Sequence, residues 1–158
     1  MILGITGHRA GPEMGGYDLP NKTYLKVCKE LDQLFKELKP DKVLSGMCIG
    51  VDQWSCIVCL RNNIKYSAII PFEGQELFWP EQSKKTYNTL RKLASEEVIV
   101  SPGKYSASKM QIRNQYIVNN CDKLIAVFNK SKTNSGTYNC IKYAESIGKE
   151  ILFINPLI

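Results

Sequence analysis

The segment LSGMCIGVDQW, residues 44–54, decides the fold class because two glycines join an apolar run to a helix-like run. DKVLSG (41–46) is typical of a short strand, and GVDQWSCIVCLRNN (50–63) is typical of a helix. A strand leading through a tight turn into a helix is the repeating unit of α/β proteins. Gly46 and Gly50 lie at the start of that helix, where glycines let backbone N–H groups approach an anion.

The same alternation runs along the whole chain. Strand-like runs occupy residues 1–6, 41–46, 64–72, 96–101, 122–129 and 149–155, and helical patterns cover 22–38, 50–63, 81–94, 106–121 and 135–148. Near-continuous apolar strands separated by helices indicate a parallel sheet covered on both faces. The sequence therefore predicts a Rossmann-like three-layer α/β/α sandwich with a mainly parallel sheet, in one domain over residues 1–158.

The composition is that of an ordinary globular chain, with 44% hydrophobic and 23% charged residues among 158. The apolar runs are only strand-sized and residues 1–11 lack a secretory pattern, so we expect a cytoplasmic protein that does not bind membranes. The net charge of +6 favours anionic ligands without identifying one.

Six cysteines lie mostly within apolar patterns, and a reducing cytosol favours small core residues over disulfides. Cys56 and Cys59 form a lone C-x-x-C motif, without the second Cys or His pair of a zinc site. We therefore expect no metal, and no resident cofactor.

Polar or glycine-bearing segments follow four of the expected strands: TGHR (6–9), SGMCIGVD (45–52), PFEGQ (71–75) and NKSKTNSGT (129–137). In a parallel sheet these segments converge on one edge, where ligands bind. SGMCIGVD opens a helix and suits phosphate, but it matches neither G-x-G-x-x-G nor a Walker A loop. The second glycine turn, NSGTYNCIKYAE (134–145), repeats the arrangement and strengthens the expectation, while two capped helix starts without a ligand are the alternative.

These segments also carry a resemblance to the SLOG superfamily, named for the Smf/DprA and LOG proteins, and most closely to its YpsA-like branch. LSGMCIGVD resembles the S-G-x-x-x-G-[IV]-[DE] turn of DprA and YpsA proteins, and PFEGQELFW resembles P-F-x-x-Q-x-x-x-W of YpsA-like proteins. RNQYIVNNCDKLIAVF and SGTYNCIKYAESIGKEILFI are similar to two further segments of these proteins, so the resemblance spans nearly the whole chain.

The resemblance implies a Rossmann-like domain whose glycine turns bind a nucleotide or a nucleotide-derived ligand. LOG members cleave an N-glycosidic bond with a P-G-G-x-G-T-x-x-E motif, but Cys140 stands at the position of the catalytic Glu and TNS replaces P-G-G. Whether the chain is an enzyme therefore stays open. If it has glycosidic activity, Asp52 and Glu73 are the candidate carboxylates.

The candidate ligand-binding residues are Gly7, His8, Arg9, Ser45, Gly46, Gly50, Asp52, Phe72, Gln75, Arg113, Asn114, Ser135, Gly136 and Thr137. Arg9 and Arg113 can pair with phosphate, and His8 can stack on or hydrogen-bond a base. Structural alternatives stay open for Asp52 as a helix cap, for Asn114 as a loop contact and for Trp79 as a core residue.

The leading hypothesis is binding of a phosphate-containing nucleotide or nucleotide-derived signalling molecule, as a sensor or sequestering module, for example in a phage or bacterial nucleotide-signalling conflict. The alternatives are an enzyme that cleaves an N-glycosidic or phosphate bond of a nucleotide, and DprA-like binding of single-stranded DNA. Among partners we rank nucleic acid below a small molecule, and the resemblance implies a homo-oligomer.

Overall fold

The computed structural model describes residues 1–158 as six strands, five α-helices and one short 3-10 helix. The strands are β1 (Ile2–Gly7), β2 (Lys42–Ser45), β3 (Lys65–Ile70), β4 (Glu96–Ile99), β5 (Lys123–Val127) and β6 (Glu150–Ile154). The helices are α1 (Lys22–Leu38), α2 (Val51–Arg61), α3 (Glu81–Leu93), α4 (Ala107–Asn120) and α5 (Gly136–Ser146), with the 3-10 helix η1 at Pro12–Met14.

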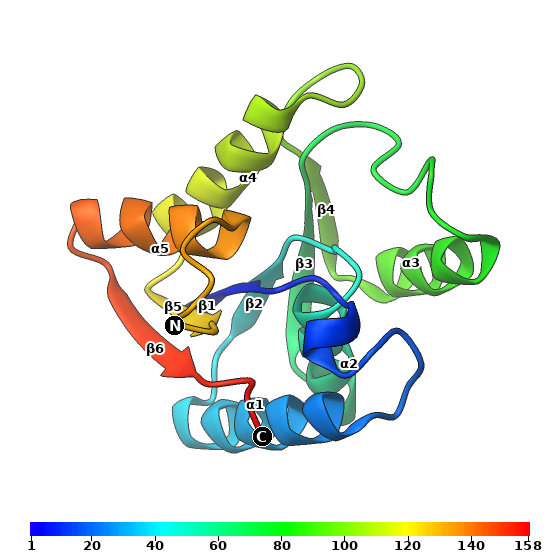
Figure 1. Ribbon diagram of the computed structural model, residues 1–158. Coiled ribbons are helices and arrows are strands. Elements are labelled where there is room, and N and C mark those ends of the chain that lie inside the picture. The colour runs from blue at the N-terminus through cyan, green and yellow to red at the C-terminus, as the bar shows by residue number, and fades with distance from the viewer.

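All six strands form one parallel sheet in the order β4-β3-β2-β1-β5-β6. Figure 1 shows α4 and α5 on one face of this sheet, and α1 and α2 on the other. The predicted Rossmann-like three-layer sandwich is therefore confirmed.

The order of the strands creates the position of the site. The chain steps outward from β1 to β4, and then crosses back to place β5 on the free side of β1. Beyond the carboxyl ends of β1 and β5, the loops that follow these strands lead to helices on opposite faces of the sheet. Such a switch point is where open α/β sheets bind ligands.

The two faces of the sheet bury cores of unequal size. The face covered by α1, α2 and α3 has a cluster of 23 buried residues, whereas the α4 and α5 face has a cluster of eight. Helix α2 lies at the centre of the larger cluster, and eight of its eleven residues are buried. This central burial places the start of α2 against β1 and β2.

Several boundaries differ from the sequence-based ranges. Strand β3 ends at Ile70 and not at residue 72, because Pro71 cannot donate a ladder hydrogen bond and Phe72 turns into the loop that follows. Helix α4 ends at Asn120, and Gly136 begins α5 with Ser135 as its N-cap.

No helix of the chain is both long and apolar enough to cross a membrane. All six cysteines are buried and free. Burial raises the pKa of the Cys56 thiol to about 12, which keeps this member of the C-x-x-C motif protonated and unreactive.

Candidate functional site

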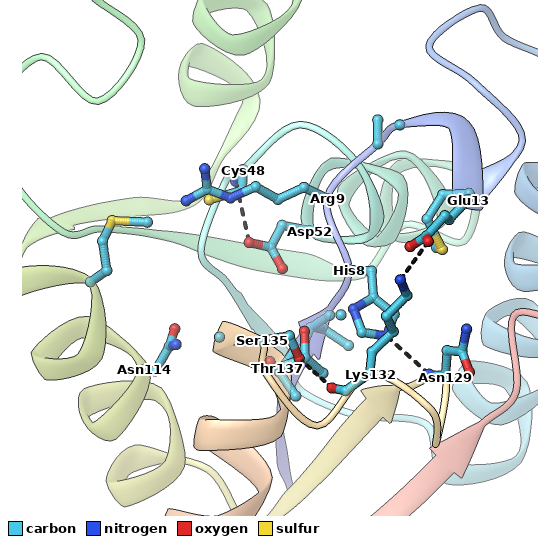
Figure 2. A pocket seen from close by; sticks show the side chains of 18 of the residues that line it. His8, Arg9, Glu13, Cys48, Asp52, Asn114, Asn129, Lys132, Ser135 and Thr137 are labelled. Carbon is cyan, nitrogen blue, oxygen red and sulfur yellow. Dashed lines mark hydrogen bonds and ion pairs between the residues drawn. The ribbon is translucent and has the colours of Figure 1, made fainter. Parts of the chain in front are cut away.

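A pocket of about 740 Å³ lies at the switch point between β1 and β5. Four segments form its walls: the end of β1 with the loop to η1, the start of α2, the middle of α4, and the β5–α5 loop with the start of α5. Figure 2 shows side chains from these segments, which are far apart in sequence, facing one another across the cavity.

Nine of the predicted ligand-binding residues line this pocket. They are Gly7, His8, Arg9, Asp52, Arg113, Asn114, Ser135, Gly136 and Thr137. The other five, Ser45, Gly46, Gly50, Phe72 and Gln75, do not line it. The two groups differ in what their atoms contact, so they are described in turn.

Gly50 allows two loops to approach each other closely. The segments around Arg9 and Gly50 form an antiparallel bridge, in which the Ala10 amide donates to the Ile49 carbonyl oxygen at 2.9 Å. A Cβ on Gly50 would lie 2.5 Å from the Ala10 nitrogen, and its φ of +119° is one that residues with side chains rarely adopt. The glycine is thus required by contact between backbones rather than by contact with an anion.

Gly46 is enclosed by the side chain of Arg113. A Cβ there would lie 2.6 Å from Nη1 of Arg113. The Gly46 carbonyl oxygen accepts hydrogen bonds from Arg113 Nη1 at 2.6 Å and from Gln75 Nε2 at 3.0 Å. The first glycine turn is therefore filled by the protein's own donors, which leaves no room for a phosphate at Gly46.

Arg113 is 3% exposed and its guanidinium serves the fold. Besides Gly46, it donates to the Ile69 carbonyl oxygen at 3.2 Å and to Asn114 Oδ1 at 3.0 Å. These bonds tie α4 to the ends of β2 and β3. Arg113 contributes positive charge to the pocket, but most of its donors are already engaged.

Asp52 is 7% exposed and lies in the first turn of α2. Its Oδ2 accepts a hydrogen bond from the Cys48 amide at 3.2 Å, and its Oδ1 accepts none from the protein. Burial raises the pKa of this carboxyl, although Arg113 and Arg9 lower it in part. Asp52 therefore closes the preceding turn but does not cap α2, whose N-cap residue is Gly50 without a side-chain cap, and its Oδ1 is an unpaired oxygen in the pocket wall.

The start of α5 is open, whereas residues 8–10 cover the start of α2. Ser135 Oγ caps the helix by accepting from the Tyr138 amide at 3.1 Å. The amides of Gly136 and Thr137 have no protein acceptor, and a Cβ on Gly136 would meet nothing within 4 Å. Free amides at a helix start, with about half a positive charge from the helix dipole, are the kind of group to which anions bind in other proteins.

The ring of His8 joins the ends of β1 and β5. Its Nε2 accepts a hydrogen bond from the Asn129 amide at 2.9 Å, and the ring lies 5.7 Å from that of Phe128 between centroids. Burial lowers the pKa of His8, with a further lowering by Lys132 and an opposing contribution from Glu13.

Two further cations lie at the rim. Arg9 is exposed and makes no ion pair or hydrogen bond with the protein. Lys132 forms an ion pair with Glu13 across the mouth of the pocket, linking the β5–α5 loop to η1 (Figure 2). Both cations are therefore available, one free and one exchangeable, to an anionic ligand.

The remaining predicted residues support the pocket from outside. Ser45 Oγ donates to the Asp52 carbonyl oxygen at 2.8 Å, and Gln75 Oε1 accepts from the Tyr87 hydroxyl at 3.0 Å. Phe72 packs edge-on against Tyr105. Glu73, the second candidate carboxylate, is exposed on the β3–α3 loop and does not line the pocket.

Sequence reasoning missed several lining residues. Gly11, Pro12, Glu13, Met14 and Tyr17 belong to the loop after TGHR, and Met110, Gln111 and Ile117 belong to α4. Asn129 and Lys132 lie within NKSKTNSGT but were not singled out. The β5–α5 residues had a detectable signal, since they directly follow a strand, whereas the α4 residues are exposed to the cavity only because of how the helix packs.

A second, smaller pocket of about 140 Å³ adjoins the first. It shares Arg9, Ala10, Tyr17 and Cys48 with the main pocket, and Ile49 and Trp79 complete its mostly apolar wall. Trp79 also packs edge-on against Tyr87, so it serves the core and this wall together.

The YpsA family model, described as the YspA SLOG family, matches residues 3–156. The chain belongs to the SLOG family. It is 30% identical over 160 residues to the SPbeta prophage-derived protein YoqJ of Bacillus subtilis, covering 87% of this chain and 92% of YoqJ. A UPF0398 protein of Halalkalibacterium halodurans is 24% identical over 147 residues, covering 87% of this chain and 77% of the relative.

Two solved structures with similar folds extend the comparison of this SLOG chain. DNA processing protein A (DprA) of Streptococcus pneumoniae superposes with a TM-score of 0.69 at 22% identity, covering 99% of this chain and 50% of DprA. The molybdenum cofactor binding protein of Rippkaea orientalis has a TM-score of 0.60 at 18% identity, covering 98% of this chain and 76% of that protein. At these identities the likeness concerns the fold.

Proposed function

We propose that this SLOG chain binds a phosphate-containing nucleotide or nucleotide-derived molecule in the pocket at the switch point, as a sensor or sequestering module. The supporting observation is that the amides of Gly136 and Thr137, two residues that line the cavity of about 740 Å³, have no protein acceptor. Unlike the Gly46 turn, this helix start has no protein group in the place of an anion.

The charges around α5 suit the same ligand. Arg9 is free to make a forked contact with a phosphate oxygen pair, and Lys132 can exchange its contact with Glu13 for the ligand. The small apolar pocket next to Arg9, bounded by Tyr17 and Trp79, suits a flat nucleobase. A molecule with phosphate at one end and an aromatic group at the other fits both features.

The solved neighbours bind different molecules. One is a molybdenum cofactor binding protein, and another, DNA processing protein A of Helicobacter pylori, binds single-stranded DNA. The fold is therefore compatible with several phosphate-bearing ligands, and the choice must rest on this chain's own pocket.

The test is calorimetric titration with AMP, ADP and ADP-ribose, with adenosine as the control that lacks phosphate. We expect the phosphorylated compounds to bind and adenosine to bind at least tenfold more weakly. Gly136→Asp places a carboxylate in open space at the start of α5 and should weaken binding at least tenfold, because it repels phosphate.

Ser146→Asp is the matched control, since it makes the same change in charge at the opposite end of α5, away from the pocket. Equal binding of adenosine and AMP, or equal effects of the two substitutions, would contradict the proposal. Chromatography of the same mixtures tests the alternative: release of free base, abolished by Asp52→Asn, would assign the pocket to an enzyme with Asp52 as general acid.

A further inference from the structure

His8 is the only histidine of the chain, and the surroundings of its ring define its protonation state. Its Nε2 lies 2.9 Å from the amide nitrogen of Asn129, which has a proton to donate and no lone pair to offer. Nε2 must therefore be unprotonated in this arrangement. A neutral imidazole then carries its single proton on Nδ1.

The second ring nitrogen faces the cavity. Figure 2 shows this nitrogen, Nδ1, turned toward the side of the pocket that is formed by Asp52 and Ser135. Nδ1 makes no hydrogen bond with the protein. The neighbouring ring of Phe128, itself stacked on Tyr138 at 6.2 Å, limits rotation of the imidazole. The ring thus holds a donor at a defined place in the wall.

We infer that His8 is a specificity-determining residue locked as the Nδ1–H tautomer, which donates a hydrogen bond to an acceptor oxygen or nitrogen of the ligand while its Nε2 holds the β5–α5 loop in place. The identity of the ligand rests on the proposed function. The tautomer of His8 and the hydrogen bond by which its Nε2 fixes the β5–α5 loop do not depend on the proposed function.

The Nε2 contact reaches the anion site through a chain of hydrogen bonds. The Asn129 carbonyl oxygen accepts from the Lys132 amide at 2.9 Å, and the Lys132 carbonyl oxygen accepts from Ser135 Oγ at 3.0 Å. Ser135 in turn caps α5. Displacement of Asn129 is therefore transmitted along the loop to the free amides of Gly136 and Thr137.

Protonation of Nε2 has two opposing effects. It adds a positive charge near the proposed phosphate site. It also makes Nε2 a donor that faces the donor N–H of Asn129, so the hydrogen bond that holds the loop is lost. We expect the second effect to prevail, because the loop positions both Lys132 and the free amides of Gly136 and Thr137, which the proposed function places around the phosphate. Acidification should then weaken binding, the reverse of what charge alone predicts.

The charged groups around the ring set the pH range. Glu13 from η1 favours protonation of His8, whereas Lys132 from the β5–α5 loop and burial oppose it, so its pKa lies below the ordinary 6.5. The other charged side chains that line the pocket are Arg9, Asp52 and Arg113. The hold on the loop is complete at neutral pH and is lost as the pH falls through this lowered pKa.

Nitrogen NMR of histidine-labelled protein tests the lock without any ligand, since one histidine gives one pair of ring signals. We expect the Nδ1–H tautomer at pH 7.5, and an Asn129 amide signal that titrates with the same midpoint as the ring. An Nε2–H tautomer at pH 7.5, or an Asn129 signal that does not follow the ring, overturns the inference.

Calorimetry with ADP-ribose at pH 7.5 and 5.5 tests the link to binding. Its two phosphates lack the second ionisation near pH 6 of a phosphate monoester, so the charge of the probe stays constant. We expect affinity to fall about three- to tenfold on acidification in the wild type, and His8→Phe to bind weakly at both pH values.

A rise in affinity at pH 5.5, or a pH dependence that persists in His8→Phe, also overturns the inference. Circular dichroism at both pH values distinguishes loss of binding from loss of folding. If ADP-ribose binds at neither pH, the proposed function fails for this probe, while the NMR result still decides on the tautomer and the loop.

Discussion

Single glycines with similar sequence surroundings have different roles in this protein. Gly50 and Gly136 both stand at the start of a helix. A side chain at Gly50 would collide with the backbone of residues 8–10, whereas one at Gly136 would enter open space. The requirement for glycine is steric at the first position, and the second remains accessible to a ligand.

Gly50→Ala should destabilise the fold by roughly 2–4 kcal/mol, because the new Cβ meets backbone atoms and the φ of +119° is strained for alanine. Urea unfolding followed by circular dichroism measures the loss. Gly11→Ala is the matched control: Gly11 has an extended backbone and no atoms within 4 Å of an added Cβ, so a change within about 0.5 kcal/mol is expected. Similar losses for the two variants would show that the close approach at Gly50 is relieved by movement.

At the scale of elements, the starts of α2 and α5 differ, although the sequence predicted an anion-binding helix start at both. The N-terminus of α2 is covered by the chain itself, since the Val51 amide donates to the His8 carbonyl oxygen at 3.3 Å and residues 8–10 pack against Gly50. The N-terminus of α5 also has two amides without a protein acceptor, as α2 has at Asp52 and Gln53, but no atom lies within 4 Å of a Cβ added at Gly136. Helix α5 is therefore the element on which the proposed anion site depends.

Ser135→Ala and Ser106→Ala separate helix stability from ligand binding. Both serines are N-caps, of α5 and α4, and each accepts a hydrogen bond from an amide three residues on. Each substitution should cost about 1 kcal/mol of unfolding free energy, measured in urea. Only Ser135→Ala should also weaken ADP-ribose binding, because Ser106 lies outside the pocket. Equal affinities of the two variants would place the phosphate away from α5.

At the scale of the whole molecule, the switch in strand order brings the two halves of the sheet together around one cavity. The β1–α1 loop and the β5–α5 loop are more than 100 residues apart, yet the Asn129 amide bonds to His8 and Lys132 pairs with Glu13. A ligand of the kind proposed would therefore contact both halves. Self-association, which the family resemblance implied, stays a prediction.

Salt dependence distinguishes a small ligand from a DNA strand. The net charge of +6 attracts any polyanion, and a protein that neutralises 6–10 phosphates loses about 10³–10⁵ in affinity between 50 and 200 mM salt. A nucleotide that meets Arg9, Lys132 and the α5 amides makes far fewer charged contacts, so we expect ADP-ribose affinity to fall less than about tenfold over this range. Fluorescence anisotropy with oligo(dT) under the same conditions gives the comparison, and tight oligo(dT) binding that survives 200 mM salt would favour the DNA-binding alternative.

Local patterns were sufficient for the secondary structure and fold class. Each of the six strand-like runs and five helical patterns became one element, because apolar spacing reports which face of a segment is buried. Boundaries such as the end of β3 differ by a few residues, since they depend on where neighbouring strands stop pairing. The segment LSGMCIGVDQW did mark a strand, a turn and a helix in that order.

By itself, then, the sequence determined a parallel α/β sandwich of the SLOG family and the edge of the sheet at which its polar segments gather. Only the tertiary structure decided which helix start is open. Arg113 reaches Gly46 from 67 residues away, and Ala10 abuts Gly50 from a separate loop. Whether a backbone amide meets a ligand or another part of the chain depends on such long-range neighbours, which local spacing does not encode.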